Sequence, residues 1–318
     1  MPQKMQFVVD GIIPIIPTPF HEDETVDCRS LRVLIEFART AGACAVCLPA
    51  YASEFYKLSE TERRLVVEEA VAQAAGRIPV IGQVNYPSAR QAVETAISLQ
   101  KTGVSAIAAA VPRMFGMAEK DLYRYFEQLL AAIKIPLIIQ DFNPGGPTLS
   151  PNFILNLHRA HPHFRYVKLE DPLMGTKVRA IREATNNEVG VIEGWGGMYM
   201  MELIPAGICG VMPGLGLTDL LARVFQLVRQ GRRDQAYPIF QGVLPQIVFC
   251  LQHMELFHHA EKMLLQARGT LPTIVVRELR MELEEGDRDY ISFLNNKILD
   301  LLDQLDLPRN PAASKINS

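Results

Sequence analysis

The chain has 318 residues, a net charge of −3 at pH 7 and 48% hydrophobic residues. This length suits one large domain or two average ones, and the composition is that of an ordinary globular protein. The scattered basic residues give no footprint for nucleic acid or for an anionic membrane. No run approaches the roughly 20 apolar residues of a membrane span, and the N-terminal stretch is too interrupted for a secretory signal. We therefore expect a cytoplasmic protein.

Short apolar runs, rich in β-branched residues, recur along most of the chain. Each run is almost continuously apolar rather than alternating, which predicts a strand buried on both faces of a parallel sheet. In chain order the runs are GIIPIIPT (11–18), ACAVCLPA (43–50), IPVIGQV (78–84), SAIAAAVP (105–112), IPLIIQD (135–141), FRYVKLE (164–170), EVGVIEG (188–194) and ICGVMPG (208–214).

Helical patterns lie between these runs. Ser59 and Glu62 have the spacing of a capping box, and Gly76 is a stop signal for the helix that follows them. Ser150 is a helix cap with Pro151 at the first helical position. Similar helical spacing recurs over residues 119–133, 171–185 and 217–231.

Strands that alternate with helices in this way predict an α/β fold, a (β/α)8 TIM barrel over residues 8–230. An open doubly wound sheet is the main competitor, but it would usually carry a glycine cluster after the first strand, and PFHEDETVD (19–27) has none. Residues 231–306 show helices without strands and predict a C-terminal helical extension. For residues 307–318 we expect a disordered tail.

Lys168 stands inside the apolar run FRYVKLE, near the end of the sixth predicted strand. The C-terminal ends of barrel strands form the active face, and a neutral amine in an apolar wall is a nucleophile that can form a Schiff base with a carbonyl group. The alternative is a structural ion pair between Lys168 and Glu170 at the rim of the barrel. The residues alone leave these two interpretations balanced.

Four segments together carry a resemblance to a known family. They are GIIPIIPTPF (11–20), SEFYKLSETER (53–63), YVKLED (166–171) and PAGICGVMPG (205–214). With them the chain resembles the dihydrodipicolinate synthase / N-acetylneuraminate lyase family of lysine-dependent aldolases and dehydratases. The resemblance extends over nearly the whole chain. It implies that Lys168 forms an imine with pyruvate or another small 2-keto acid, that no cofactor takes part, and that the protein is a homo-oligomer, a tetramer or a dimer.

The departures from the family pattern are informative. Residues 50–54 read Ala-Tyr-Ala-Ser-Glu where the synthases and lyases carry Gly-Thr-Thr-Gly-Glu. Gln140 replaces the proton-shuttling tyrosine of the fifth strand, and a glutamine cannot act as a general acid or base at ordinary pH. VPRMFG (111–116) replaces the Pro-Tyr-Tyr segment of the relay, and the substrate-binding arginine of the synthases falls among Gly145 and Gly146.

The combination of Ala-x-x-Ser-Glu (50–54), IIQD (138–141) and VIEGWGG (191–197) resembles the branch of the family that acts on 2-keto-3-deoxy sugar acids. We expect a Schiff-base lyase of that branch, most simply a dehydratase for a substrate like 2-keto-3-deoxy-L-arabonate. A pyruvate-dependent aldolase or a dihydrodipicolinate synthase-like enzyme is the alternative within the family. A keto-acid sensor with decayed catalysis is the alternative from another class, although it would not need a lysine that forms an imine.

The resemblance also implies residues that bind the substrate near the lysine. Ser53 and the backbone N–H of Ala52 are expected to hold the substrate carboxylate, or Ser53 is simply a turn residue. Gln140 is expected to bond the carbinolamine or a substrate hydroxyl, unless it only ends its strand. Tyr51 offers a hydroxyl that could replace part of the lost relay.

Four further residues have supporting or wall positions in this scheme. Glu193 and Trp195 are expected to line the sugar-acid end of the pocket, with rim packing as the alternative for Trp195. Thr18 is expected to orient Glu54 or its loop rather than to contact substrate.

The histidine clusters do not predict a metal site. HRAHPH (158–163) falls on the barrel face opposite the active site. HMELFHH (253–259) lacks the spacing of four residues that places two ligands on one helix face. We therefore expect no metal.

Overall fold

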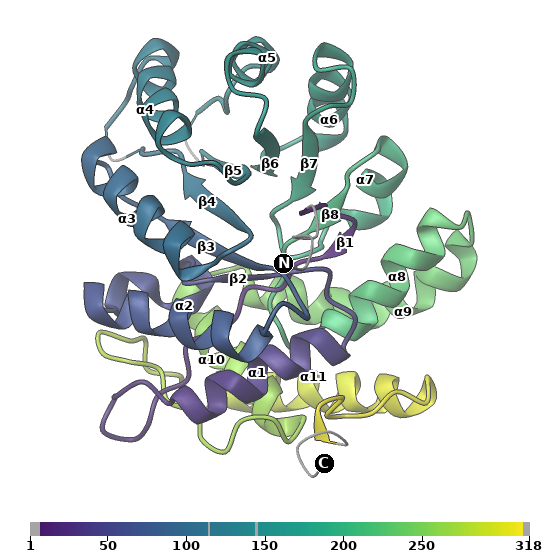
Figure 1. The fold of residues 1–318 in the computed structure, drawn as a ribbon. Coiled ribbons are helices and arrows are strands. Elements are labelled where there is room, and N and C mark those ends of the chain that lie inside the picture. The colour runs from purple at the N-terminus through teal and green to yellow at the C-terminus, as the bar shows by residue number, and fades with distance from the viewer. Residues whose placement is uncertain (1–6, 114, 144–145, 314–318) are drawn as a thin grey trace.

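The computed structural model describes residues 7–113, 115–143 and 146–313, and within them a curled sheet of eight parallel strands is surrounded by helices (Figure 1). Every strand begins inside one of the predicted apolar runs. The strands are β1 (Gly11–Ile12), β2 (Val46–Leu48), β3 (Val80–Val84), β4 (Ala106–Ala110), β5 (Leu137–Phe142), β6 (Phe164–Glu170), β7 (Gly190–Glu193) and β8 (Gly210–Val211).

Helices follow the strands and cover the outside of the sheet. Ser59 caps the second helix in the predicted capping box with Glu62, and the helix ends at Ala74 with Ala75 as its C-cap, just before the expected Gly76. Ser150 caps the fifth, with Pro151 at its first position. The helices are α1 (Cys28–Thr40), α2 (Glu60–Ala74), α3 (Ala89–Thr102), α4 (Glu119–Ala132), α5 (Pro151–Ala160), α6 (Met174–Ala184), α7 (Met200–Ala206) and α8 (Thr218–Arg229), with short 3-10 turns η1 (Tyr51–Ser53) and η2 (Phe55–Lys57) after β2.

The strand order is β1-β8-β7-β6-β5-β4-β3-β2, and each neighbouring pair is parallel. Pro14 and Pro17 lack backbone N–H groups, which explains why β1 is so short. Closure between the first and second strands is made by the single bridge of Ile15 with Cys47, and a second bridge joins Ile15 to Gly214 after β8. The predicted (β/α)8 barrel is confirmed.

The two faces of β6 explain how a lysine fits into an apolar strand. Side chains alternate along a strand, and Val167 and Leu169 pack outward among the surrounding helices. Tyr166 points inward and packs in the cluster of side chains inside the barrel. Lys168 and Glu170 therefore also point inward, at successively higher levels toward the C-terminal mouth of the barrel.

Three further helices form the predicted C-terminal extension: α9 (Arg233–Cys250), α10 (Met254–Ala267) and α11 (Glu285–Gln304). α9 packs against α8, α11 packs against α9, and α10 packs against η1. The extension thus reaches from the outside of the barrel to the loop after β2. Of the helices in the described ranges, none is both long and apolar enough to cross a membrane.

The expectation of a disordered tail from residue 307 is wrong for residues 307–313. The Arg268 guanidinium is 1% exposed and donates to the carbonyl oxygens of Arg309, at 2.6 Å, and of Pro308, at 3.3 Å. Ala312 is fully buried. A buried guanidinium needs acceptors, and the tail supplies them. Residues 314–318 lie outside the described residues.

Candidate active site

A cavity of about 670 Å³ opens at the C-terminal mouth of the barrel. It brings together side chains from β5, β6, the loops after β2, β7 and β8, and the link between α9 and α10. Its polar and aromatic lining includes Tyr51, Tyr56, Gln140, Phe142, Lys168, Glu170, Trp195, Gln252, His253 and Phe257. This is the face on which barrel enzymes carry their active sites.

Lys168 lies at the bottom of this cavity and is the only lysine that lines it in the described part of the chain. Its side chain is almost buried, and Nζ lies 2.8 Å from Oε1 of Glu170. The ion pair that the sequence offered as an alternative is therefore present, but it faces the cavity rather than the outer rim. A carboxylate at this distance can accept a proton from the lysine as the amine attacks a carbonyl group.

Gln140 completes a triad with Lys168 and Glu170. It stands directly opposite Lys168 in the parallel ladder between β5 and β6. Its Nε2 donates to the same Oε1 of Glu170, at 2.8 Å. Gln140 therefore does more than end its strand, because its amide holds the carboxylate beside the lysine.

Glu170 is the cavity residue whose importance the sequence underestimated. Its spacing of two from Lys168 in a strand was the available signal, since this spacing puts both side chains on one face. Gly194, just after β7, accommodates it: a Cβ atom added there would lie 2.4 Å from Cγ of Glu170. The glycine after β7 thus makes room for the carboxylate.

The loop after β2 contributes Tyr51 and Ala52 to the cavity lining. Burial, and secondly the charge of Glu170, raises the pKa of the Tyr51 phenol, so this group stays protonated and can donate a hydrogen bond. Ser53 differs from the expectation. It is fully buried and its Oγ donates to the carbonyl oxygen of Ile16, at 2.6 Å. Its hydroxyl fixes the loop to the first strand and does not face the cavity.

Thr18 and Glu54 support this loop from below. Thr18 Oγ1 donates to the carbonyl oxygen of Ser53, at 2.7 Å, so it orients the loop rather than Glu54 itself. Glu54 is buried against α10, where Lys262 Nζ lies 2.6 Å from its Oε1. Lys57 Nζ lies 3.2 Å from the other oxygen, and the backbone N–H of Arg277 donates to it at 3.1 Å.

The two residues expected to line the sugar-acid end have different positions. Trp195 lines the cavity and meets the ring of Phe142 edge to face, with ring centroids 5.8 Å apart. Glu193 does not line it. It is fully buried, and its Oε2 accepts from the backbone N–H of Gly197, at 2.8 Å. Burial raises the pKa of Glu193 to about 7.

The link between α9 and α10 was not expected in the cavity. Residues 250–254 and Phe257, from the end of α9 to the first turn of α10, line the cavity. No local pattern could have predicted this, since the contact joins residues far apart in sequence.

Gly145, one of the two positions that replace the arginine of the synthases, lies outside the described residues. Among the described residues, no group of three or more His, Cys, Asp or Glu side chains could hold a metal ion.

The eight-stranded sheet and the cavity at its C-terminal mouth define the class of protein: a (β/α)8 barrel of the kind that carries enzyme active sites. The chain belongs to the Dihydrodipicolinate synthetase family, whose sequence model matches residues 8–251. The protein is accordingly a lyase.

Named relatives and structures agree with this assignment. The chain is 27% identical over 241 residues to the L-2-keto-3-deoxyarabonate dehydratase of Azospirillum brasilense, an alignment that covers 74% of this chain and 78% of the relative. It is 30% identical over 148 residues to the probable 2-dehydro-3-deoxy-D-pentonate aldolase YjhH of Escherichia coli, covering 46% and 49% of the two chains. The fold matches the crystal structure of dihydrodipicolinate synthase from Rhodopseudomonas palustris with a TM-score of 0.84 at 24% identity, covering 91% and 97%.

Proposed function

We propose that this protein forms a Schiff base between Lys168 and a 2-keto-3-deoxy sugar acid and removes water from it. The observation that carries the proposal is the triad of Lys168, Glu170 and Gln140 in the barrel mouth, with the amine 2.8 Å from a carboxylate. The similarity to a 2-keto-3-deoxyarabonate dehydratase supports the substrate class.

Lys168 begins the reaction by attacking the C2 ketone. Glu170 takes the proton that the amine must lose, and the carbinolamine then expels water to give a protonated imine. This imine withdraws electrons and acidifies the C3 hydrogens. Because no titratable group in the cavity lies nearer to Lys168 among the described residues, we assign removal of the C3 proton to the Glu170 carboxylate.

Elimination follows from the resulting enamine. The nitrogen lone pair re-forms the C2=N bond while the C2=C3 electron pair shifts to form C3=C4 and the C4–O bond breaks. Glu170 gives its new proton to the departing hydroxyl, which leaves as water. For a five-carbon substrate, a proton shift from C5 to C3 leaves a C4=C5 enol, and transfer of the O5 proton to C4 converts this enol to an aldehyde. Hydrolysis of the imine then releases 2,5-dioxopentanoate and free Lys168. Gln140 holds Glu170 in place during both transfers. The substrate carboxylate binds at the loop after β2, at the backbone N–H of Ala52.

An aldolase is the second candidate, favoured by the partial alignment with the pentonate aldolase. The same imine would accept electrons from the C3–C4 bond and release pyruvate and an aldehyde. The distinction depends on which C4 bond breaks: Glu170 must protonate the C4 hydroxyl in the dehydratase and deprotonate it in the aldolase. The protein would act as a homo-oligomer in either case, as the family resemblance implies.

Product analysis separates these candidates. The purified protein is incubated with 2-keto-3-deoxy-L-arabonate and, separately, with the C4 epimer, and products are followed by NMR. We expect 2,5-dioxopentanoate from one epimer and no release by Lys168→Arg. Pyruvate with glycolaldehyde would instead establish the aldolase. Stoichiometric adducts without product from any sugar acid would favour a keto-acid sensor.

A further inference from the structure

A row of three amide side chains leads away from Glu170 across the barrel mouth. Gln140 on β5, Gln83 on β3 and Asn85 just after β3 are linked by hydrogen bonds. We propose that Gln83 and Asn85 are positioning residues, which fix the direction of the Gln140 amide and so hold the Glu170 carboxylate as the base beside Lys168. This inference rests on the proposed function, because it assigns Glu170 its role there.

The direction of the row is set at one end by a backbone group. The N–H of Ala110 can only donate, and it donates to Asn85 at 3.1 Å. Asn85 must therefore present its carbonyl oxygen, Oδ1. The same oxygen accepts from Gln83 at 3.1 Å, so Gln83 must present its NH2 group.

The hydrogen bonds at the other end of the row, between Gln83, Gln140 and Glu170, run in the same donor-to-acceptor direction. The NH2 group of Gln83 also donates to Oε1 of Gln140, at 2.7 Å. With its oxygen engaged, Gln140 can only direct its NH2 group toward Glu170, which it meets at 2.8 Å. An ionised carboxylate is a pure acceptor, so an amide donor at this point favours the ionised form of Glu170.

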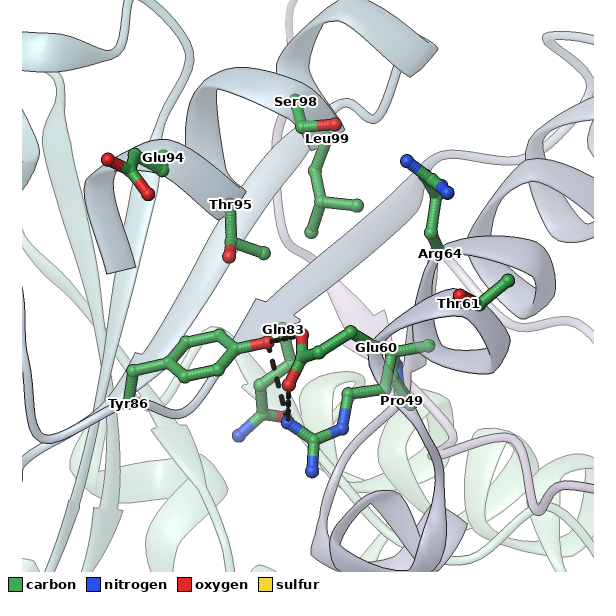
Figure 2. A pocket seen from close by; sticks show the side chains of 11 residues that line it. Pro49, Glu60, Thr61, Arg64, Gln83, Tyr86, Glu94, Thr95, Ser98 and Leu99 are labelled. Atoms are coloured by element: carbon green, nitrogen blue, oxygen red, sulfur yellow. Dashed lines mark hydrogen bonds and ion pairs between the residues drawn. The ribbon is translucent and has the colours of Figure 1, made fainter. Parts of the chain in front are cut away.

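Burial makes this direction hard to reverse. Gln83 and Gln140 are 7% and 6% exposed, so little water could compensate an inverted amide. The oxygen of Gln83 has the thiol of Cys47 as a donor, at 3.6 Å. Gln83 also lines a second cavity of about 270 Å³ between α2 and α3, where Tyr86 contacts Glu60 (Figure 2).

The other titratable groups around Glu170 do not set the direction of the amide row. Lys168 pairs with it on β6, Tyr51 faces it from η1 as a neutral phenol, and Glu193 is buried behind it on β7. Among the described residues, Gln140 is the neutral donor to its carboxylate. The amide row is therefore the feature that orients a hydrogen-bond donor toward the Glu170 carboxylate.

The test compares two variants that add the same charge to the row. Gln83→Glu at pH 8 has no proton to donate to Gln140, which must then invert and turn its oxygen toward Glu170. Asn85→Asp keeps an acceptor for both Ala110 and Gln83, so it preserves the direction. We expect kcat to fall by more than about 10-fold in Gln83→Glu with little change in KM, and by less than about 3-fold in Asn85→Asp. Equal losses in the two variants would mean that charge alone acts, and would overturn the proposal.

A second readout needs no substrate. The side-chain amide of Gln140 is followed by NMR in glutamine-labelled protein, with Gln140→Met for assignment. We expect its NH2 resonance to move on Glu170→Gln and on Gln83→Glu but hardly on Asn85→Asp. Gln83→Met, which adds no charge, should also move it. An unmoved resonance in both Gln83 variants would contradict the positioning role even if the dehydratase proposal holds, and a moved resonance would support it even if that proposal fails.

Discussion

Glu170 is the residue on which the proposed chemistry depends most after Lys168. Its carboxylate contacts both the amine and the Gln140 amide at 2.8 Å. Glu170→Gln retains the shape of the side chain and loses the base. We expect turnover to fall by about 10²- to 10⁴-fold, because proton transfer by a positioned group contributes about that much, while Lys168 still forms a trappable imine. Steady-state kinetics beside adduct mass checks this, and near-normal turnover would assign the proton transfer to another group.

Gly194, just after the neighbouring strand β7, limits the space for the same carboxylate. A substitution there tests whether the position of the carboxylate matters. In Gly194→Ala the new methyl group would lie 2.4 Å from Cγ of Glu170, which must then move away from Lys168. We expect activity to fall at least about 10-fold with the fold retained, since a displacement near 1 Å can cost about 100-fold. Gly286→Ala, in α11 and with open space around its Cβ, is the matched control and should keep full activity. Equal activity of the two variants would contradict the account.

At the scale of elements, α10 holds the loop after β2 through a buried ion pair. Lys262 and Glu54 are each 1% exposed at their side chains, with Nζ and Oε1 2.6 Å apart. Lys262→Met leaves Glu54 with Lys57 and the backbone of Arg277 as remaining partners. We expect the free energy of unfolding to fall by about 2 to 4 kcal/mol, because a buried charge loses its main partner.

Denaturant unfolding measures this loss, with Lys297→Met as the control. Lys297 is exposed on α11, 4.0 Å from Asp300, and its replacement should change stability by less than about 1 kcal/mol. Similar losses in the two variants would show that the pair with Glu54 does not hold the loop.

At the scale of the whole molecule, Glu261 joins the C-terminal extension to the barrel. Its Oε1 accepts from the backbone N–H of Gly216, at 2.7 Å, and burial raises its pKa to about 7. The folded protein thus keeps this proton to higher pH than the unfolded chain does. Its contribution to stability is present near pH 4.5 and is lost as the pH rises through about 7.

Glu261→Gln removes this titration and retains an oxygen for Gly216. We expect the variant and the wild type to have similar free energies of unfolding at pH 5. At pH 8 the variant should be more stable by about 2 to 3 kcal/mol, since each pKa unit corresponds to about 1.4 kcal/mol. Denaturant titrations at both pH values test this, and a stability difference independent of pH would contradict a buried, titrating Glu261.

The sequence predicted most of the fold because local signals agreed. The apolar runs contain the beginnings of all eight described strands, and Ser59 and Ser150 cap their helices as expected. The site was only partly predictable. The alternation of a strand suffices to place Lys168 and Glu170 on one face. Ser53 and Glu193 were misplaced, because a residue near a strand end can point to the cavity or bond the backbone, and sequence does not distinguish these. The segment near His253 that lines the cavity depends on packing of the extension, for which no local signal exists.

Borohydride trapping shows whether Lys168 forms a Schiff base with a keto acid. The protein is incubated with pyruvate and, separately, with 2-keto-3-deoxy sugar acids, then reduced and analysed by intact mass and peptide mapping. We predict one covalent adduct per chain on Lys168, absent in Lys168→Arg and retained in Glu170→Gln. Absence of an adduct on Lys168 with every keto acid would contradict the Schiff-base account and leave the Lys168–Glu170 pair as a structural feature of the barrel.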